Sequence, residues 1–150
     1  YALQVTDITL YSFSHHHRAA WREWKRLFKF GMVGLTGIVV NLAVLTLLML
    51  AGISGYIALF FAIILAILNN FIWNDLWTFR DSARRMATST WERLRLFYIV
   101  SAGGAVINYG VAVLLTYFVG MKIDLADLIG ILIGFIWNFL INRRYTWGRK

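Results

Sequence analysis

The chain has 150 residues, of which 60% are hydrophobic and 15% charged, and its mean hydropathy is +0.66. A soluble domain of this length rarely reaches such a composition, because polar residues must cover its surface. The net charge of +8 would by itself suggest a nucleic-acid partner. However, the basic residues lie beside hydrophobic stretches, which is typical of membrane topology, so we expect membrane lipids and no nucleic acid as partners.

The first 28 residues precede the hydrophobic part of the chain. Trp21, Trp24 and Phe28 recur at helical spacing, while basic residues, among them Arg22 and Lys25, fall on another face. This pattern predicts an interfacial amphipathic helix, with its apolar face in the lipid headgroups. The simplest role for such a helix is that of a membrane anchor.

Four hydrophobic stretches follow. Between Lys29 and Asp75 no residue is charged, and none is charged between Arg95 and Lys122. Because one crossing takes about 20 apolar residues, we predict transmembrane helices at roughly 29–50, 56–74, 94–119 and 123–142. Tight turns are expected at 51–55 and from 120 to 122.

The connection over residues 75–93 is longer and charged. Within it, Ser89 and Glu92 have the spacing of a capping box, which predicts that the third spanning helix starts there.

The basic residues predict the orientation. Of the 15 Lys and Arg residues, all but Lys122 flank the same ends of the predicted spans. By the positive-inside rule these ends are cytoplasmic. The sequence therefore predicts a multi-pass protein of the cytoplasmic (inner) membrane with both termini in the cytoplasm.

The two predicted hairpins resemble one another in sequence. Gly37 and Asn41 recur as Gly104 and Asn108, 67 residues later, and the motif N-F-x-x-N-x-x-aromatic-T-aromatic begins at both Asn70 and Asn138. We therefore predict an all-α integral membrane fold. A four-helix domain over residues 29–147 would contain two parallel helical-hairpin repeats, about 29–80 and 94–147, related by an axis along the membrane normal.

Small residues and asparagines form matching stripes on the second and fourth spans. These stripes are expected to face each other or the first and third spans. The six amides that would line the interior of the bundle are Asn41, Asn70, Asn74, Asn108, Asn138 and Asn142. Two interpretations stay open: the amides hold the helices together by hydrogen bonds, or they line a path for a polar substrate.

Arg143 and Arg144 end the last span. Two adjacent arginines at headgroup level can bind a phosphate bidentately, and they can equally act as a positive-inside stop signal. The first repeat has Asp75 at the matching place, which would disfavour an anion there unless Arg80 or Arg84 neutralises it.

The sequence carries no recognisable catalytic set. No serine or cysteine triad, paired catalytic carboxylates or phosphate loop is present, and consecutive His15, His16 and His17 lack the i, i+4 spacing of a metal pair. We expect no catalytic residues, no metal and no cofactor. A small multidrug exporter is a less favoured alternative, because no Glu lies within a span and the charge bias fixes one orientation.

The motifs resemble those of GtrA-like membrane proteins. Phe30, Val33, Gly34, Gly37 and Asn41 are similar to the opening F-x-x-V-G-x-x-G-x-x-x-N of that family. The segment from Asn138-Phe139 to Asn142-Arg143-Arg144-Tyr145 resembles the last helix of that family. The resemblance covers roughly residues 27–147.

This resemblance implies a role with polyprenyl-phosphate-linked sugars that build cell-surface polysaccharide. Family members are proposed to move the lipid-linked monosaccharide across the membrane. Alternatively, such a domain anchors a family-2 glycosyltransferase of the dolichol-phosphate mannose synthase type, either fused or as a separate partner. The chain begins with Tyr1 rather than Met, which leaves such a fusion open. Because four helices are few for a transport path, a homo-oligomer is a further expectation.

Overall fold

The computed structural model describes the backbone of residues 2–148 and the side chains of residues 20–148. Arg18, Arg149 and Lys150, which entered the prediction of orientation, therefore lie outside the described side chains. The described part is built from helices. The four long ones are α1 (Ala2–Leu50), α2 (Gly55–Trp73), α4 (Thr90–Val119) and α5 (Ile123–Ile141). All four are long and apolar enough to cross a membrane, which confirms the four predicted spans.

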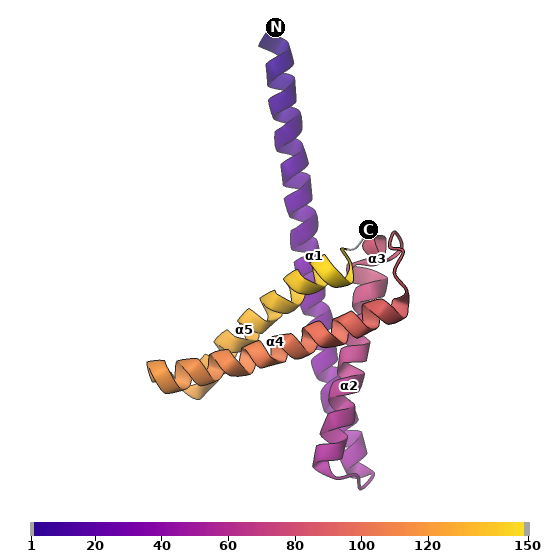
Figure 1. Cartoon of the computed structure of the whole chain (residues 1–150), viewed down its shortest axis with the longest axis vertical. Coiled ribbons are helices and arrows are strands. Elements are labelled where there is room, and N and C mark those ends of the chain that lie inside the picture. Colours follow the sequence, from indigo (N-terminus) through magenta and orange to yellow (C-terminus); the bar gives the residue numbers. More distant parts are fainter. Residues whose placement is uncertain (1, 149–150) are drawn as a thin grey trace.

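Helix α1 differs from the expectation in one respect. We predicted a separate interfacial helix before the first span, but α1 runs without a break from Ala2 to Leu50. Nothing near Lys29 would interrupt it, since the chain has no Pro and the residues around this boundary continue the helix. At 1.5 Å per residue, its 49 residues span about 73 Å, more than twice the thickness of the hydrocarbon core. The first part of α1 thus extends the axis of the first span (Figure 1).

The helix boundaries follow local chemistry. Gly52 and Gly120 both adopt positive φ, at 83° and 71°, where the chain turns between the helices of each hairpin. The predicted capping box at the start of α4 is confirmed: Ser89 Oγ accepts from the Glu92 amide at 3.2 Å, and Glu92 Oε2 accepts from the Ser89 amide at 2.8 Å.

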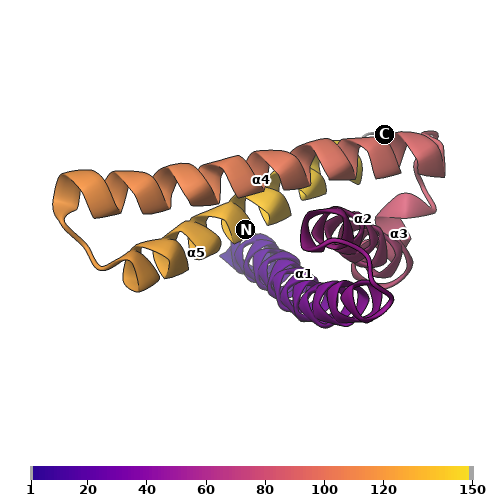
Figure 2. The ribbon, with the colours of Figure 1, turned by 90° about the horizontal axis from the view of Figure 1, so that it is seen from below.

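The two hairpins, α1–α2 and α4–α5, are joined at one end only. Within each hairpin the helices contact one another extensively, whereas α2 with α4 and α1 with α5 make few contacts. Figures 1 and 2 show the hairpins as two arms that cross and diverge, with their turns far apart. We call the shared end, where α3 (Arg80–Ala83) and the start of α4 lie, the junction end. The turn of each hairpin, at Gly52 and at Gly120, lies away from this end (Figure 1).

The stripes of small residues face the partner helix of their own hairpin. Ala58, Ala62 and Ala66 of α2 are buried, and α1 is the main neighbour of α2. On α5, Gly130 and Gly134 lie against the backbone of Asn108 and Gly104 in α4. Of the two predicted placements, the structure therefore has the stripes facing the first and third spans, where small side chains let the backbones approach closely.

Candidate functional site

Each repeat ends at the junction end in a turn of π-helix. The turn η1 (Asn74–Thr78) extends α2, and η2 (Asn142–Thr146) extends α5. The amide of Phe79 donates to the Asn74 carbonyl at 2.8 Å, and the amide of Trp147 donates to the Asn142 carbonyl at 3.0 Å. Single π-turns within helices are frequent at functional sites. Here both occur at the asparagine that the sequence marks in each repeat.

Six buried aromatic residues connect the two repeats. Phe79 stacks on Trp147 with ring centroids 4.5 Å apart and an interplanar angle of 12°. Around this pair, Phe30 contacts Phe139 at 5.7 Å between centroids, and Phe97 contacts Phe71 at 5.8 Å. Every member thus has its counterpart in the other repeat. We call this cluster the aromatic junction: Phe30, Phe71, Phe79, Phe97, Phe139 and Trp147.

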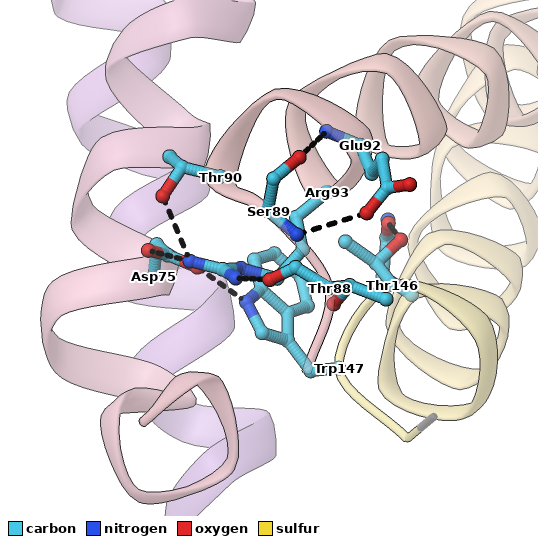
Figure 3. Close-up of polar contacts among 9 residues, drawn as sticks. Asp75, Thr88, Ser89, Thr90, Glu92, Arg93, Thr146 and Trp147 are labelled. Carbon is cyan, nitrogen blue, oxygen red and sulfur yellow. Dashed lines mark hydrogen bonds and ion pairs between the residues drawn. The ribbon is translucent and has the colours of Figure 1, made fainter. Parts of the chain in front are cut away.

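Asp75 accepts three hydrogen bonds beside the aromatic junction (Figure 3). Arg93 donates to its two carboxylate oxygens from Nε at 2.8 Å and from Nη2 at 3.0 Å, and Trp147 Nε1 donates to Oδ1 at 2.8 Å. The side chains of Arg93 and Asp75 are only 8% and 12% exposed. The sequence left open whether Arg80 or Arg84 neutralises Asp75. Neither of them does so: both are exposed, and Arg93 is the bidentate partner.

The matching place in the second repeat is an open basic cleft of about 1190 Å³. We call it the basic cleft. Its cationic lining is Arg26 of α1, Arg85 after α3, and Arg143 and Arg144 of η2. Met86, Leu140 and Ile141 add an apolar wall. Arginines beside an apolar surface at the end of a span suit a molecule that carries a phosphate on a hydrocarbon chain.

One carboxylate faces these arginines. Glu23 of α1 has Oε1 3.2 Å from Arg26 Nη1, with the geometry of a hydrogen bond. Its Oε2 lies 2.8 Å from Arg143 Nε as an ion pair, but this oxygen accepts no hydrogen bond from the described residues. Because Arg143 Nε and Glu23 Oε2 are close but not aligned for a hydrogen bond, their attraction is mainly Coulombic. It is therefore weaker than the bidentate ion pair of Arg93 with Asp75.

Four of the six predicted asparagines line a second, smaller cavity of about 280 Å³ between the hairpins. These are Asn70, Asn74, Asn108 and Asn138. Within the described chain, the Oδ1 atoms of Asn74, Asn108 and Asn138 are buried without a hydrogen-bond donor. Buried acceptors without donors are rare and favour a bound donor such as a hydroxyl or water. We call this space the amide cavity.

The other two asparagines lie elsewhere. Asn41 is half-buried on α1 and does not line the amide cavity. Asn142 is fully buried, and its Oδ1 accepts from Thr146 Oγ1 at 2.7 Å. Of the six amides predicted to line the interior, four thus share one cavity, while Asn41 on α1 and Asn142 in η2 lie outside it.

Several residues of the site were not predicted from the sequence. Arg26, Arg85 and Glu23 face the arginines of η2 although they come from segments that we assigned to an anchor and a connection. A signal for Arg26 was present: the repeat offset of 67 residues relates it to Arg93. Arg85 and Glu23 have no comparable signal.

The fold and this site define a multi-pass membrane protein made of two duplicated helical hairpins that join at a basic, aromatic end. Residues 29–147 match the family described as "GtrA/DPMS, transmembrane domain", and the chain belongs to this family. The chain is also 44% identical over 125 residues to a dolichol-phosphate mannosyltransferase of Pyrococcus furiosus. The match covers 83% of this chain and 34% of that relative, so the chain spans about a third of its length.

Proposed function

We propose that this domain moves a prenyl-phosphate-linked sugar across the membrane for the synthesis of surface glycans. The observation that carries the proposal is the pairing of the basic cleft with the amide cavity. The first supplies arginines for a phosphate, and the second supplies orphaned carbonyl oxygens for sugar hydroxyls. The family and the named relative support a role with polyprenyl-phosphate sugars.

In this proposal the junction end faces the cytoplasm, where most of the basic residues lie. Arg143 and Arg144 bind the phosphate, while the prenyl tail stays in lipid along the apolar wall of the cleft. The sugar then passes between the diverging hairpins, where Asn70, Asn74, Asn108 and Asn138 accept hydrogen bonds from its hydroxyls.

The aromatic junction lies between the two compartments. Phe79 lines the basic cleft, Phe30 lines the amide cavity, and their rings contact each other at 6.2 Å between centroids. Passage from one compartment to the other would require this contact to open, so the aromatic junction would act as the gate of the path.

The test is a translocation assay with the full chain in proteoliposomes and a short-chain prenyl-phosphate mannose. We expect Arg143→Ala with Arg144→Ala to abolish transport while membrane insertion is retained. The matched control is Arg80→Ala with Arg95→Ala, which removes two exposed charges from the same end outside the basic cleft. Transport by the Arg143/Arg144 variant at the rate of the control would exclude the role of these arginines.

A second function is favoured by the named relative. The chain corresponds to about a third of a dolichol-phosphate mannosyltransferase, so these helices would serve as the membrane domain of such an enzyme, fused to it or bound to it. The intact mass of the native, untagged protein from its source membrane tests fusion. A mass near 17.3 kDa would favour the translocase, and a mass larger by a catalytic domain would favour the anchored enzyme.

A further inference from the structure

The two repeats differ at one charged position. Asp75 of η1, in the first repeat, binds Arg93 near the start of α4, so this ion pair joins the two hairpins. The repeat offsets place Arg143 where Asp75 stands and Arg26 where Arg93 stands. The positions of the Asp75–Arg93 ion pair thus correspond to the two cations Arg143 and Arg26, which both line the basic cleft.

Two arginines that share a site repel each other, and an anion between them relieves that repulsion. The protein supplies Glu23, which contacts Arg26 at 3.2 Å and Arg143 at 2.8 Å. The repeat equivalent of Glu23 is Thr90, whose hydroxyl accepts from Arg93 Nη2 at 3.2 Å. Glu23 therefore stands where Thr90 stands, as a minor ligand of its arginine, and the place of the main ligand, the Asp75 carboxylate, is taken by the cation Arg143.

Glu23 is a weakly held counter-ion. Its side chain is 31% exposed, against 12% for Asp75, and its Oε2 accepts no hydrogen bond from the described residues. A phosphate group has more charge and more acceptor oxygens than a carboxylate, and it can bind two guanidinium groups bidentately. It would therefore satisfy Arg26 and Arg143 better than Glu23 does.

We infer that Arg26 and Arg143 form the seat of the phosphate, and that Glu23 is a resident anion which the phosphate displaces and which sets the affinity of the basic cleft. This inference rests on the proposed function and adds two residues to it. Arg26 binds the ligand, and Glu23 acts as a competitor that weakens binding, so that the ligand is released again. The ligand is the phosphate of a prenyl phosphate, with a phospholipid headgroup as the other source of the same chemistry.

The test measures the affinity of the full chain in neutral detergent for farnesyl phosphate at low salt. Glu23→Gln keeps the shape of the side chain and removes its charge, so we expect Kd to fall at least about threefold. The matched control Asp127→Asn removes an exposed charge at the other end of the spans and should leave Kd within about a factor of two. Arg26→Gln should raise Kd about tenfold or more, since it removes a charge-assisted bond although Arg143 and Arg144 remain.

Thermal unfolding of each variant checks its fold. If Glu23→Gln does not fold, Glu23→Thr takes its place, because Thr90 is the residue at the matching position. A folded Glu23 variant that binds as the wild type does, or more weakly, overturns the inference.

Binding of farnesol and of phosphatidylglycerol distinguishes failure of this inference about Glu23 from failure of the proposed function. If the wild type binds farnesyl phosphate no better than farnesol, the phosphate site itself is absent and the proposed function loses its basis. If Glu23→Gln strengthens binding of phosphatidylglycerol as much as that of farnesyl phosphate, the counter-ion role holds and the ligand is a phospholipid headgroup.

Discussion

Phe79 and Trp147 stack at the centre of the molecule, with ring centroids 4.5 Å apart, although 68 positions separate them in the chain. Each is the first residue after the π-helical turn of its repeat. The two residues thus stand at equivalent positions of the sequence repeat and contact each other across the boundary between the hairpins. The aromatic junction is therefore where the two hairpins hold together, since few contacts join them elsewhere.

Substitution of Trp147 should separate its stacking from its hydrogen bond. Trp147→Phe keeps a ring against Phe79 but removes the donor to Asp75, and we expect a loss of about 1.5–3 kcal/mol because the acceptor is charged. Trp147→Ala removes both and should cost about 3–5 kcal/mol. Chemical unfolding in detergent measures the difference. Equal losses for the two variants would show that stacking contributes nothing.

Loss of either partner of the buried Asp75–Arg93 ion pair should strongly lower the free energy of unfolding. Asp75→Asn leaves the Arg93 guanidinium buried without an anion, which should destabilise the fold by about 3–5 kcal/mol. Removal of both charges, by Asp75→Asn with Arg93→Met, should recover part of that loss, since no buried charge remains. The exposed Asp127→Asn is the control. A double variant less stable than Asp75→Asn alone would contradict this account of the pair.

At Gly130, in the α4–α5 interface, even a methyl group is too large. A Cβ on Gly130 would lie 2.5 Å from the backbone oxygen of Asn108, which cannot turn away as a side chain can. Gly130→Ala should therefore cost about 1–3 kcal/mol through overpacking. Gly110→Ala on α4 is the matched control, because nothing lies within 4 Å of its Cβ. Helix propensity alone should make that variant neutral or more stable by up to about 1 kcal/mol.

Substitution of Asn108 in the amide cavity should change ligand preference while leaving the free energy of unfolding nearly unchanged. Asn108 Oδ1 is buried without a donor from the described residues, so Asn108→Leu should change stability by no more than about 1 kcal/mol. If the cavity receives sugar hydroxyls, the same variant should lose the preference for a prenyl-phosphate mannose over the prenyl phosphate without sugar. Competition binding with the two lipids measures this preference. A preference equal to that of the wild type would assign the amide to helix packing.

Much of the fold could be predicted from the sequence, because its signals are local. Hydrophobic length predicts the four spans, the Ser89–Glu92 spacing predicts the start of α4, and the short turns at 51–55 and 120–122 predict the hairpins. The unbroken α1 was missed, because an amphipathic pattern shows which face is apolar but contains no information on whether the helix bends at the membrane surface.

The site was only partly predictable, because it depends on contacts between distant segments. The matched asparagines are visible in the repeat, but only the divergence of the hairpins decides that Asn70 and Asn138 line the amide cavity and Asn41 does not. Similarly, the partner of Asp75 was sought among nearby arginines, whereas the structure brings Arg93 from the next helix. The distribution of Lys and Arg predicts on which side of the membrane a residue lies, but it does not predict which residue forms an ion pair with it.

The central claim is that the basic cleft binds the phosphate of a prenyl lipid, and photo-crosslinking tests it most directly. A prenyl phosphate with a photoreactive group beside the phosphate would be irradiated with the full chain in membranes, and the labelled peptides would be mapped. We predict labels in residues 79–86 and 140–148, the walls of the basic cleft, and their loss in the Arg143→Ala/Arg144→Ala variant. Labels confined to the turns at residues 51–54 and 120–122, and unchanged in that variant, would contradict the claim.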